Sequence, residues 1–266
     1  MKVAVIQLNS KQDKQKNLLK IEQFIREAAS FGAELVALPE NCNFLGNGNT
    51  FQAEEIPSGE TTTLLSKLAK ELKIFIHAGS ITESFTKDKS YNTSFVIAPT
   101  GEIISIYRKI HLFDIEISGV SSYKESDAIE PGSKSEMVEL PFGQAGMSIC
   151  YDLRFPELYR KYALAGAKIL FVPAAFTRYT GMLHWEPLLR ARAIENQCYV
   201  IAAGQHGNYL PGKDCYGNSM IIDPWGTVVA RASEGEGIAI AELKEDLVAS
   251  ARQSIPCLQH RREDLY

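Results

Sequence analysis

The strongest constraint on the fold of this chain is an internal repeat. Four short blocks occur twice in the same order: 3–7 (VAVIQ) with 146–150 (GMSIC), 32–40 (GAELVALPE) with 166–174 (GAKILFVPA), 74–80 (IFIHAGS) with 199–205 (YVIAAGQ), and 91–101 (YNTSFVIAPTG) with 216–226 (YGNSMIIDPWG). One such match could arise by chance, but four in one order indicate two halves of similar structure. The sequence therefore predicts a pseudo-symmetric fold.

Each half has the pattern strand, helix, strand, helix and then a hairpin. Apolar residues at helical spacing occupy 17–29 and 62–72, and Pro-x-Gly turns at 99–101 and 224–226 join strand-rich runs. Two such halves can stack their sheets face to face with helices outside. We expect an α/β four-layer sandwich that forms a single domain over residues 1–266, because no Gly- or Ser-rich linker divides the chain.

The composition excludes some classes of partner. The net charge of −4 provides no positive field that would attract nucleic acid or an anionic membrane. The apolar run at 3–8 is too short for a signal peptide and predicts a first strand, and no run reaches the roughly 20 residues of a membrane helix. We therefore expect neither nucleic acid nor a membrane as a partner.

The cysteines indicate a reducing compartment. Their number is odd, they are widely spaced, and none forms a C-x-x-C pair of the kind that binds zinc. They are Cys42, Cys150, Cys198, Cys215 and Cys257. The sequence predicts a cytoplasmic protein.

Cys150 is the cysteine with unusual surroundings. It follows a predicted strand and precedes a helix that Pro156 opens and Gly166 ends. The positive end of that helix would favour the thiolate. The alternative is a buried structural cysteine, which this segment alone favours. Because equivalent strands of the two halves end at one rim, we expect Gln7, Glu40, Cys150 and Pro173 to be neighbours.

Glu40 and Lys109 could act on such a thiol. Glu40 directly follows the buried strand in LVALP, so burial should raise its pKa and let it take a thiol proton. Lys109 follows a predicted strand over 103–106; beside Cys150 it would lower the thiol pKa and neutralise a tetrahedral oxyanion. The alternatives are a loop glutamate paired with a base and a solvated lysine.

Three motifs together carry a family resemblance. They are LPE at 38–40, YRKIHL at 107–112 and CYDLRFPE at 150–157. In this order and spacing they resemble the nitrilase superfamily of carbon-nitrogen hydrolases, and the resemblance extends over 1–266. It implies an αββα sandwich that assembles as a homodimer or a higher homo-oligomer.

The resemblance also implies a mechanism that needs no metal or cofactor. Cys150 would be the nucleophile, Glu40 the general base and Lys109 the oxyanion stabiliser. Glu125 would support the lysine and the substrate, and the backbone N–H of Tyr151 would complete the oxyanion hole.

The substrate branch is indicated by three further segments, 184–203, 216–235 and 255–266. They resemble the deaminated glutathione amidases of the Nit branch, which release a 2-oxo acid together with cysteinylglycine or ammonia, according to the amide cleaved. The ω-amidases, which act on 2-oxoglutaramate and 2-oxosuccinamate, share several of these features and remain an alternative. The segment 177–183 (TRYTGML) departs from both groups.

Either substrate is a small anionic amide, so a cation must meet its carboxylate. Arg154 is the first candidate and Arg178 the second, although Arg154 could instead pair with Asp152 or Glu157. The residues predicted to bind the substrate are Tyr151, Arg154, Phe176, Thr177, Arg178 and His184.

Three other functions compete with this one. A Cys-His hydrolase would use His111 or His184 as its base. A non-catalytic binding subunit on the same fold would need none of the catalytic residues. A nucleotide-binding protein should carry a Gly-rich phosphate loop, and both common forms are missing from the sequence.

Overall fold

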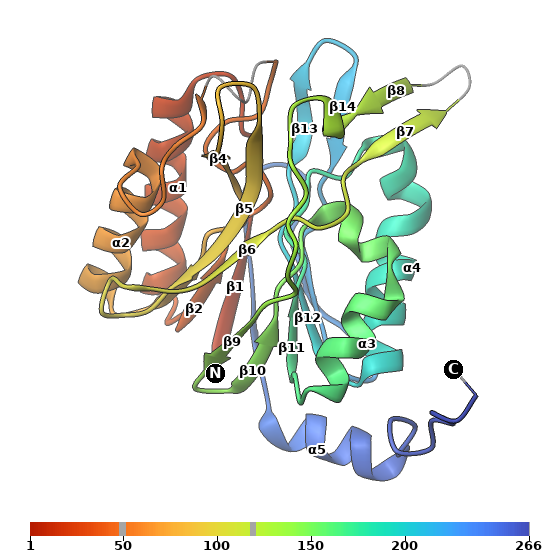
Figure 1. Ribbon diagram of the computed structural model, residues 1–266. Coiled ribbons are helices and arrows are strands. Elements are labelled where there is room, and N and C mark those ends of the chain that lie inside the picture. Colours follow the sequence, from red (N-terminus) through yellow and green to blue (C-terminus); the bar gives the residue numbers. More distant parts are fainter. Residues whose placement is uncertain (48–51, 118–120, 266) are drawn as a thin grey trace.

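The computed structural model describes residues 1–47, 52–117 and 121–265, and in it two β-sheets face each other between two pairs of helices (Figure 1). The first sheet has the order β17-β1-β2-β3-β5-β4, with β6 also paired to β5. Its strands are β1 (Lys2–Gln7), β2 (Leu35–Ala37), β3 (Phe75–His77), β4 (Ile81–Ser84), β5 (Ser90–Ile97), β6 (Ile103–Arg108) and β17 (Gly237–Glu242). Its outer face is covered by α1 (Lys14–Ser30) and α2 (Glu60–Leu72).

The second sheet has the order β16-β15-β12-β11-β10-β9. Its strands are β9 (Met137–Leu140), β10 (Gly143–Gly146), β11 (Ile169–Phe171), β12 (Tyr199–Ala202), β15 (Met220–Ile222) and β16 (Val228–Arg231). The helices α3 (Pro156–Leu164) and α4 (Arg178–Asn196) cover its outer face, and α5 (Glu245–Ser254) follows β17 at one end of the sandwich. This arrangement is the predicted αββα sandwich.

The central strands are buried on both faces, and their side chains alternate between two cores. Val3 and Val5 of β1 pack between the sheets, whereas Ala4 and Ile6 pack under α1 and α2. His77 of β3 stacks on Phe171 of β11 with ring centroids 4.2 Å apart, so the two sheets touch directly. The sandwich is therefore packed through its middle layer.

The predicted repeat is confirmed by the strand order. β1, β2 and β3 are parallel and are followed by antiparallel β5, just as parallel β10, β11 and β12 are followed by antiparallel β15. The halves differ after their third strand: the first adds β4 to its sheet, whereas the second forms a separate hairpin of β13 (His206–Leu210) and β14 (Lys213–Tyr216).

Two hairpins stand at the rim where the central parallel strands end. They are β13–β14 and the pair β7 (Asp114–Ile117) and β8 (Ser121–Lys124) (Figure 1). None of the helices in the described part of the chain is long and apolar enough to cross a membrane.

Candidate active site

At this rim, the loop after β2 is hydrogen-bonded to the loop after β11, which is the equivalent strand of the second half. The backbone N–H of Cys150 donates to Pro173 O at 2.8 Å, and the N–H of Ala175 donates to Glu40 Oε2 at 2.7 Å. A loop of one half is thus held by a loop of the other. Gln7 turns away and accepts a bond from the N–H of Ser219 at 2.9 Å. The structure therefore brings Glu40, Cys150 and Pro173 together.

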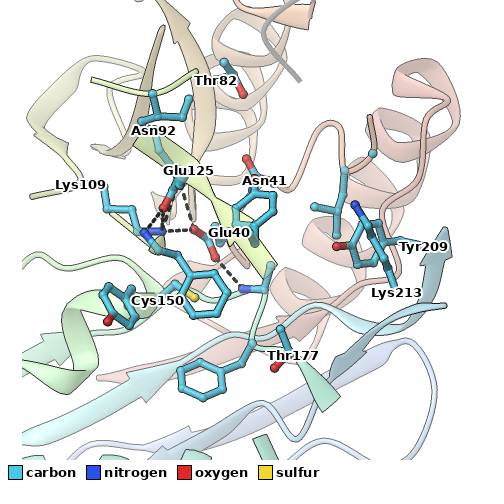
Figure 2. A pocket seen from close by; sticks show the side chains of 18 of the residues that line it. Glu40, Asn41, Thr82, Asn92, Lys109, Glu125, Cys150, Thr177, Tyr209 and Lys213 are labelled. Carbon is cyan, nitrogen blue, oxygen red and sulfur yellow. Dashed lines mark hydrogen bonds and ion pairs between the residues drawn. The ribbon is translucent and has the colours of Figure 1, made fainter. Parts of the chain in front are cut away.

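A buried charged cluster lies beside Cys150 (Figure 2). Lys109 Nζ is 3.0 Å from Glu40 Oε1 and 2.9 Å from Glu125 Oε2. Asn92 Nδ2 donates to Glu40 Oε1 at 2.9 Å and to Glu125 Oε1 at 3.3 Å. Glu40, Lys109 and Glu125 expose less than a tenth of their surface. Two carboxylates are thus held by one ammonium and one amide, away from bulk water.

Cys150 sits in a strained turn. Its φ of 48° lies in the left-handed region, which costs a residue with a side chain about 1 kcal/mol or more. A 3₁₀ turn over Cys150–Arg154 follows, and α3 begins only at Pro156. The turn directs the sulfur toward Glu40 (Figure 2).

The charges of the cluster correct two expectations. Burial raises the pKa of the Cys150 thiol well above its usual value, and nearby Glu40 raises it further, although Lys109 opposes this. The helix that was expected to favour the thiolate begins only at Pro156, and the pKa of the thiol is raised, not lowered. Burial also acts to raise the pKa of Glu40, but Lys109, the Cys150 thiol and the Ala175 N–H lower it below its ordinary value.

Lys109 keeps its proton in this environment. Burial acts to lower its pKa, but Glu125 and Glu40 raise it well above the usual lysine value. The resting cluster is therefore a neutral thiol beside an ionised Glu40 and a charged Lys109.

The cluster opens into a cavity of about 270 Å³. Its wall combines residues after β2 and on β5, such as Asn41 and Asn92, with residues of the second half, such as Tyr151. The two rim hairpins also contribute to it. A thiol, a carboxylate and an ammonium therefore face a space large enough for a small organic molecule.

The carbon-nitrogen hydrolase family matches residues 2–253 of this chain. The chain belongs to this family. It is accordingly a hydrolase that acts on the carbon-nitrogen bonds of linear amides.

Relatives of this hydrolase include proteins of two named groups. Deaminated glutathione amidase of Synechocystis is 45% identical over 97% of this chain and 97% of its own length. Human omega-amidase NIT2 is 40% identical over 100% of this chain and 96% of its own. The crystal structure of the C. elegans NitFhit protein has a TM-score of 0.94 at 39% identity, and the match covers 100% of this chain and 66% of that one.

Three of the six residues predicted to bind the hydrolase's substrate line the cavity, namely Tyr151, Phe176 and Thr177. Within the described residues, Arg154, Arg178 and His184 are not part of its wall. Arg178 is the first residue of α4 and, like His184, is exposed.

Arg154 has other partners in the hydrolase. It lies over the Phe176 ring at 5.2 Å and contacts His184 Nδ1 at 3.3 Å. The guanidinium thus packs on rings of wall residues, but Arg154 itself is not part of the wall. The prediction that Arg154 or Arg178 meets the substrate is therefore not supported by their positions.

Among the wall residues that sequence reasoning missed, Asn92, Tyr209 and Lys213 matter most for the chemistry. Asn92 bridges the two carboxylates, yet in the sequence it is one polar residue in a strand. The repeat does not mark it, because the aligned residue of the second half is Gly217. Tyr209 and Lys213 lie across the cavity from Cys150 on the β13–β14 hairpin (Figure 2). No sequence pattern marks that hairpin as part of the site.

Lys213 is the wall cation that remains available to a ligand. Lys109 is neutralised by two carboxylates, whereas Lys213 has no ion-pair partner among residues 1–47, 52–117 and 121–265. The described part of the hydrolase contains no cluster of three or more His, Cys, Asp or Glu side chains that could hold a metal ion.

Proposed function

We propose that this hydrolase cleaves a small anionic amide through a cysteine thioester, with deaminated glutathione as its substrate. The observation that carries the proposal is the cluster of Cys150, Glu40 and Lys109 at the cavity, in a chain 45% identical to a deaminated glutathione amidase. An anionic amide is the type of substrate that suits a cavity with a cation, Lys213, across from a thiol, Cys150.

The proposed reaction starts from the neutral thiol. Glu40 accepts the Cys150 proton as sulfur attacks the amide carbonyl, and Lys109 with the N–H of Tyr151 stabilises the oxyanion. Glu40 then returns the proton to the departing amine, which leaves a thioester on Cys150. A water molecule, deprotonated by Glu40, hydrolyses the thioester to a carboxylic acid and restores the thiol. Glu125 holds Lys109 in place, and the residues that act require no metal or cofactor.

Electrostatics supports a substrate whose carboxylate lies far from the sulfur. Glu40 and Glu125 against Lys109 leave a net negative charge near Cys150, which would repel a nearby substrate carboxylate. Lys213 stands on the other side of the cavity. We propose that it meets the carboxylate of the acyl part.

Replacing Lys213 by alanine should then raise KM for an anionic amide. We expect a rise of about 5-fold, because an ion pair at an exposed position is worth about 1 kcal/mol. Lys213→Arg should keep most of the affinity, and Lys124→Ala, which removes an exposed lysine outside the cavity wall, should change nothing. Steady-state kinetics with an anionic amide and its neutral analogue measures this. An equal rise for both amides would contradict the assignment.

The alternative is an ω-amidase that acts on 2-oxoglutaramate or 2-oxosuccinamate, and the 40% identity to human omega-amidase NIT2 favours it. Deaminated glutathione and 2-oxoglutaramate share one acyl part, so the two functions differ in the leaving group, which is cysteinylglycine or ammonia. The choice therefore depends on the leaving-group side of the cavity.

A panel of amides tests the proposal. We expect the highest kcat/KM for deaminated glutathione among this compound, 2-oxoglutaramate, glutamine, a nitrile and an N-carbamoyl amino acid. The measurement is product release by mass spectrometry and an ammonia assay. The highest value for 2-oxoglutaramate would establish the alternative, and turnover of the nitrile alone would exclude both amidase functions.

We further propose that residues 1–266 form one domain that acts as a cytoplasmic homodimer; Tyr266 itself lies outside the described residues. Pairing of β17 with β1 supports one domain, because it joins a late strand of the chain to the first one.

The location and the oligomer have separate support. The five free cysteines support a reducing compartment. Exposed Met182 and Leu183 on α4 offer apolar surface for a partner subunit. Light scattering of the purified protein tests the dimer, and cell fractionation tests the location.

A further inference from the structure

One buried carboxylate links the segment that carries Lys109 to the turn that carries Cys150. Asp152 has no exposed surface, and among the described residues its carboxylate accepts four hydrogen bonds. The four donors are Tyr107 Oη at 2.6 Å, His111 Nδ1 at 2.7 Å, Ile149 N at 2.8 Å and His111 N at 3.1 Å.

Two of these donors flank Lys109 in the sequence. Tyr107 and His111 lie two residues before and two residues after Lys109, so both sides of the lysine are tied to Asp152. Asp152 itself follows Cys150 by two residues. The carboxylate therefore sets the spacing between the backbone of the ammonium and the backbone of the thiol.

The same carboxylate supports the strained conformation of Cys150. Its bond to the N–H of Ile149 closes the turn in which Cys150 has a φ of 48°. Such a conformation persists only when the surrounding structure enforces it. Phe155 adds to the support, because its ring stacks on His111 with centroids 3.7 Å apart.

All these partners donate, so the position requires an acceptor with two oxygens. An asparagine would present an amide N–H₂ to backbone and side-chain donors. At least one buried N–H would then lose its partner, and the turn or the lysine segment would shift.

We propose that Asp152 is a positioning residue, which fixes the distance between Lys109 and Cys150 through Tyr107, His111 and the N–H of Ile149. The proposal rests on the proposed roles of Lys109 and Cys150. Asp152 does not line the cavity, so it acts through these neighbours and not on the substrate.

Asp152→Asn tests the link directly. We expect kcat for the preferred amide to fall about 10²-fold, because a shift of about 1 Å between reacting groups costs that much. KM should stay within about threefold of the wild type, because Lys213, which is proposed to meet the substrate carboxylate, is not among the partners of Asp152. The rate at which iodoacetamide alkylates Cys150 should fall in parallel, since Glu40 would no longer face the sulfur in the same geometry.

Variants that each remove one donor to Asp152 test the proposal if Asp152→Asn does not fold. Tyr107→Phe removes one donor and should lower kcat about 10-fold, the usual effect of one hydrogen bond to a charged group. His111→Leu should do the same, whereas His111→Asn, whose amide N–H can replace Nδ1–H, should restore most of the activity. A Cys-His mechanism with His111 as base predicts the opposite, because asparagine cannot accept the proton.

Tyr199→Phe is the matched control. Tyr199 is also buried, and its hydroxyl accepts the N–H of Lys244 at 3.0 Å, at the end of β12 opposite the rim. It should lower the melting temperature about as much as Tyr107→Phe and leave kcat unchanged. If Tyr107→Phe and His111→Leu both keep wild-type kcat, or if the control loses as much, the proposal is overturned. Full activity of Cys150→Ala would instead contradict the proposed function, and this outcome does not depend on the Asp152 variants.

Discussion

Cys150→Ala is expected to lose all measurable amide hydrolysis. The variant has no sulfur to form the thioester, and a nucleophile and its base act as one unit, so the loss should be on the order of 10⁴-fold or more. Adding Glu40→Gln to it should cost nothing further for the same reason. The measurement is release of the acyl product over hours at high enzyme concentration.

Two further variants, one of a control thiol and one of the proposed base, accompany Cys150→Ala. Cys198→Ala removes a thiol that is as buried as Cys150 but lies outside the cavity wall, so its activity should match the wild type. Glu40→Gln alone should also lose amide hydrolysis, because neither the attacking thiol nor the hydrolytic water then has a base. Residual activity of Cys150→Ala within about 10-fold of the wild type would remove the proposed nucleophile. A wild-type Cys150 that alkylates no faster than half-buried Cys257 would favour a non-catalytic subunit.

The fold could be predicted from the sequence wherever the repeat was intact. The block at 74–80 corresponds to β3 and the block at 199–205 to β12, and each takes the same place in its sheet. The difference between β4 and the β13–β14 hairpin could not be predicted. It arises between the third and fourth matched blocks, in segments 81–90 and 206–215, which have no matching sequence pattern.

The proposed catalytic residues were predictable for a physical reason. Glu40 follows β2 of the first half and Cys150 follows β10 of the second, and the parallel strands of both halves end at the same rim. Lys213 was not predictable, because a hairpin that leaves the sheet carries no periodic pattern that ties it to the rim. The anion-binding candidates Arg154 and Arg178 lie outside the cavity wall, because closeness in sequence to Cys150 or to the variable segment does not fix the direction of a side chain.

The pKa directions show where burial alone misleads. Burial was expected to dominate at Glu40, but the Lys109 ammonium at 3.0 Å and the bond from Ala175 outweigh it. At Cys150 the balance is reversed, because Glu40 adds to the effect of burial. A base with a lowered pKa beside a thiol with a raised pKa keeps the proton on sulfur until the substrate arrives.

Lys109→Ala should show how closely these groups depend on one another. Loss of an oxyanion donor costs about 10²–10³ in kcat. The variant also leaves Glu40 and Glu125 buried together with only the Asn92 amide between them, so repulsion should raise the pKa of at least one. A protonated Glu40 cannot act as the base, and the loss at pH 7 should exceed about 10³-fold. Far-UV circular dichroism should show a folded protein, because protonation relieves the repulsion.

The pH dependence and a double variant distinguish the loss of the oxyanion donor from the protonation of Glu40. Carboxylates whose pKa is raised by folding stabilise the variant at low pH, and this stability is lost as pH rises through the raised values. The activity of Lys109→Ala should change in the opposite sense and recover in part as Glu40 ionises. Lys109→Ala with Glu125→Gln removes the second charge, so it should regain a base at pH 7 and lose only the oxyanion contribution. If the single and double variants are equally inactive at every pH, Lys109 acts on the oxyanion alone and does not keep Glu40 ionised.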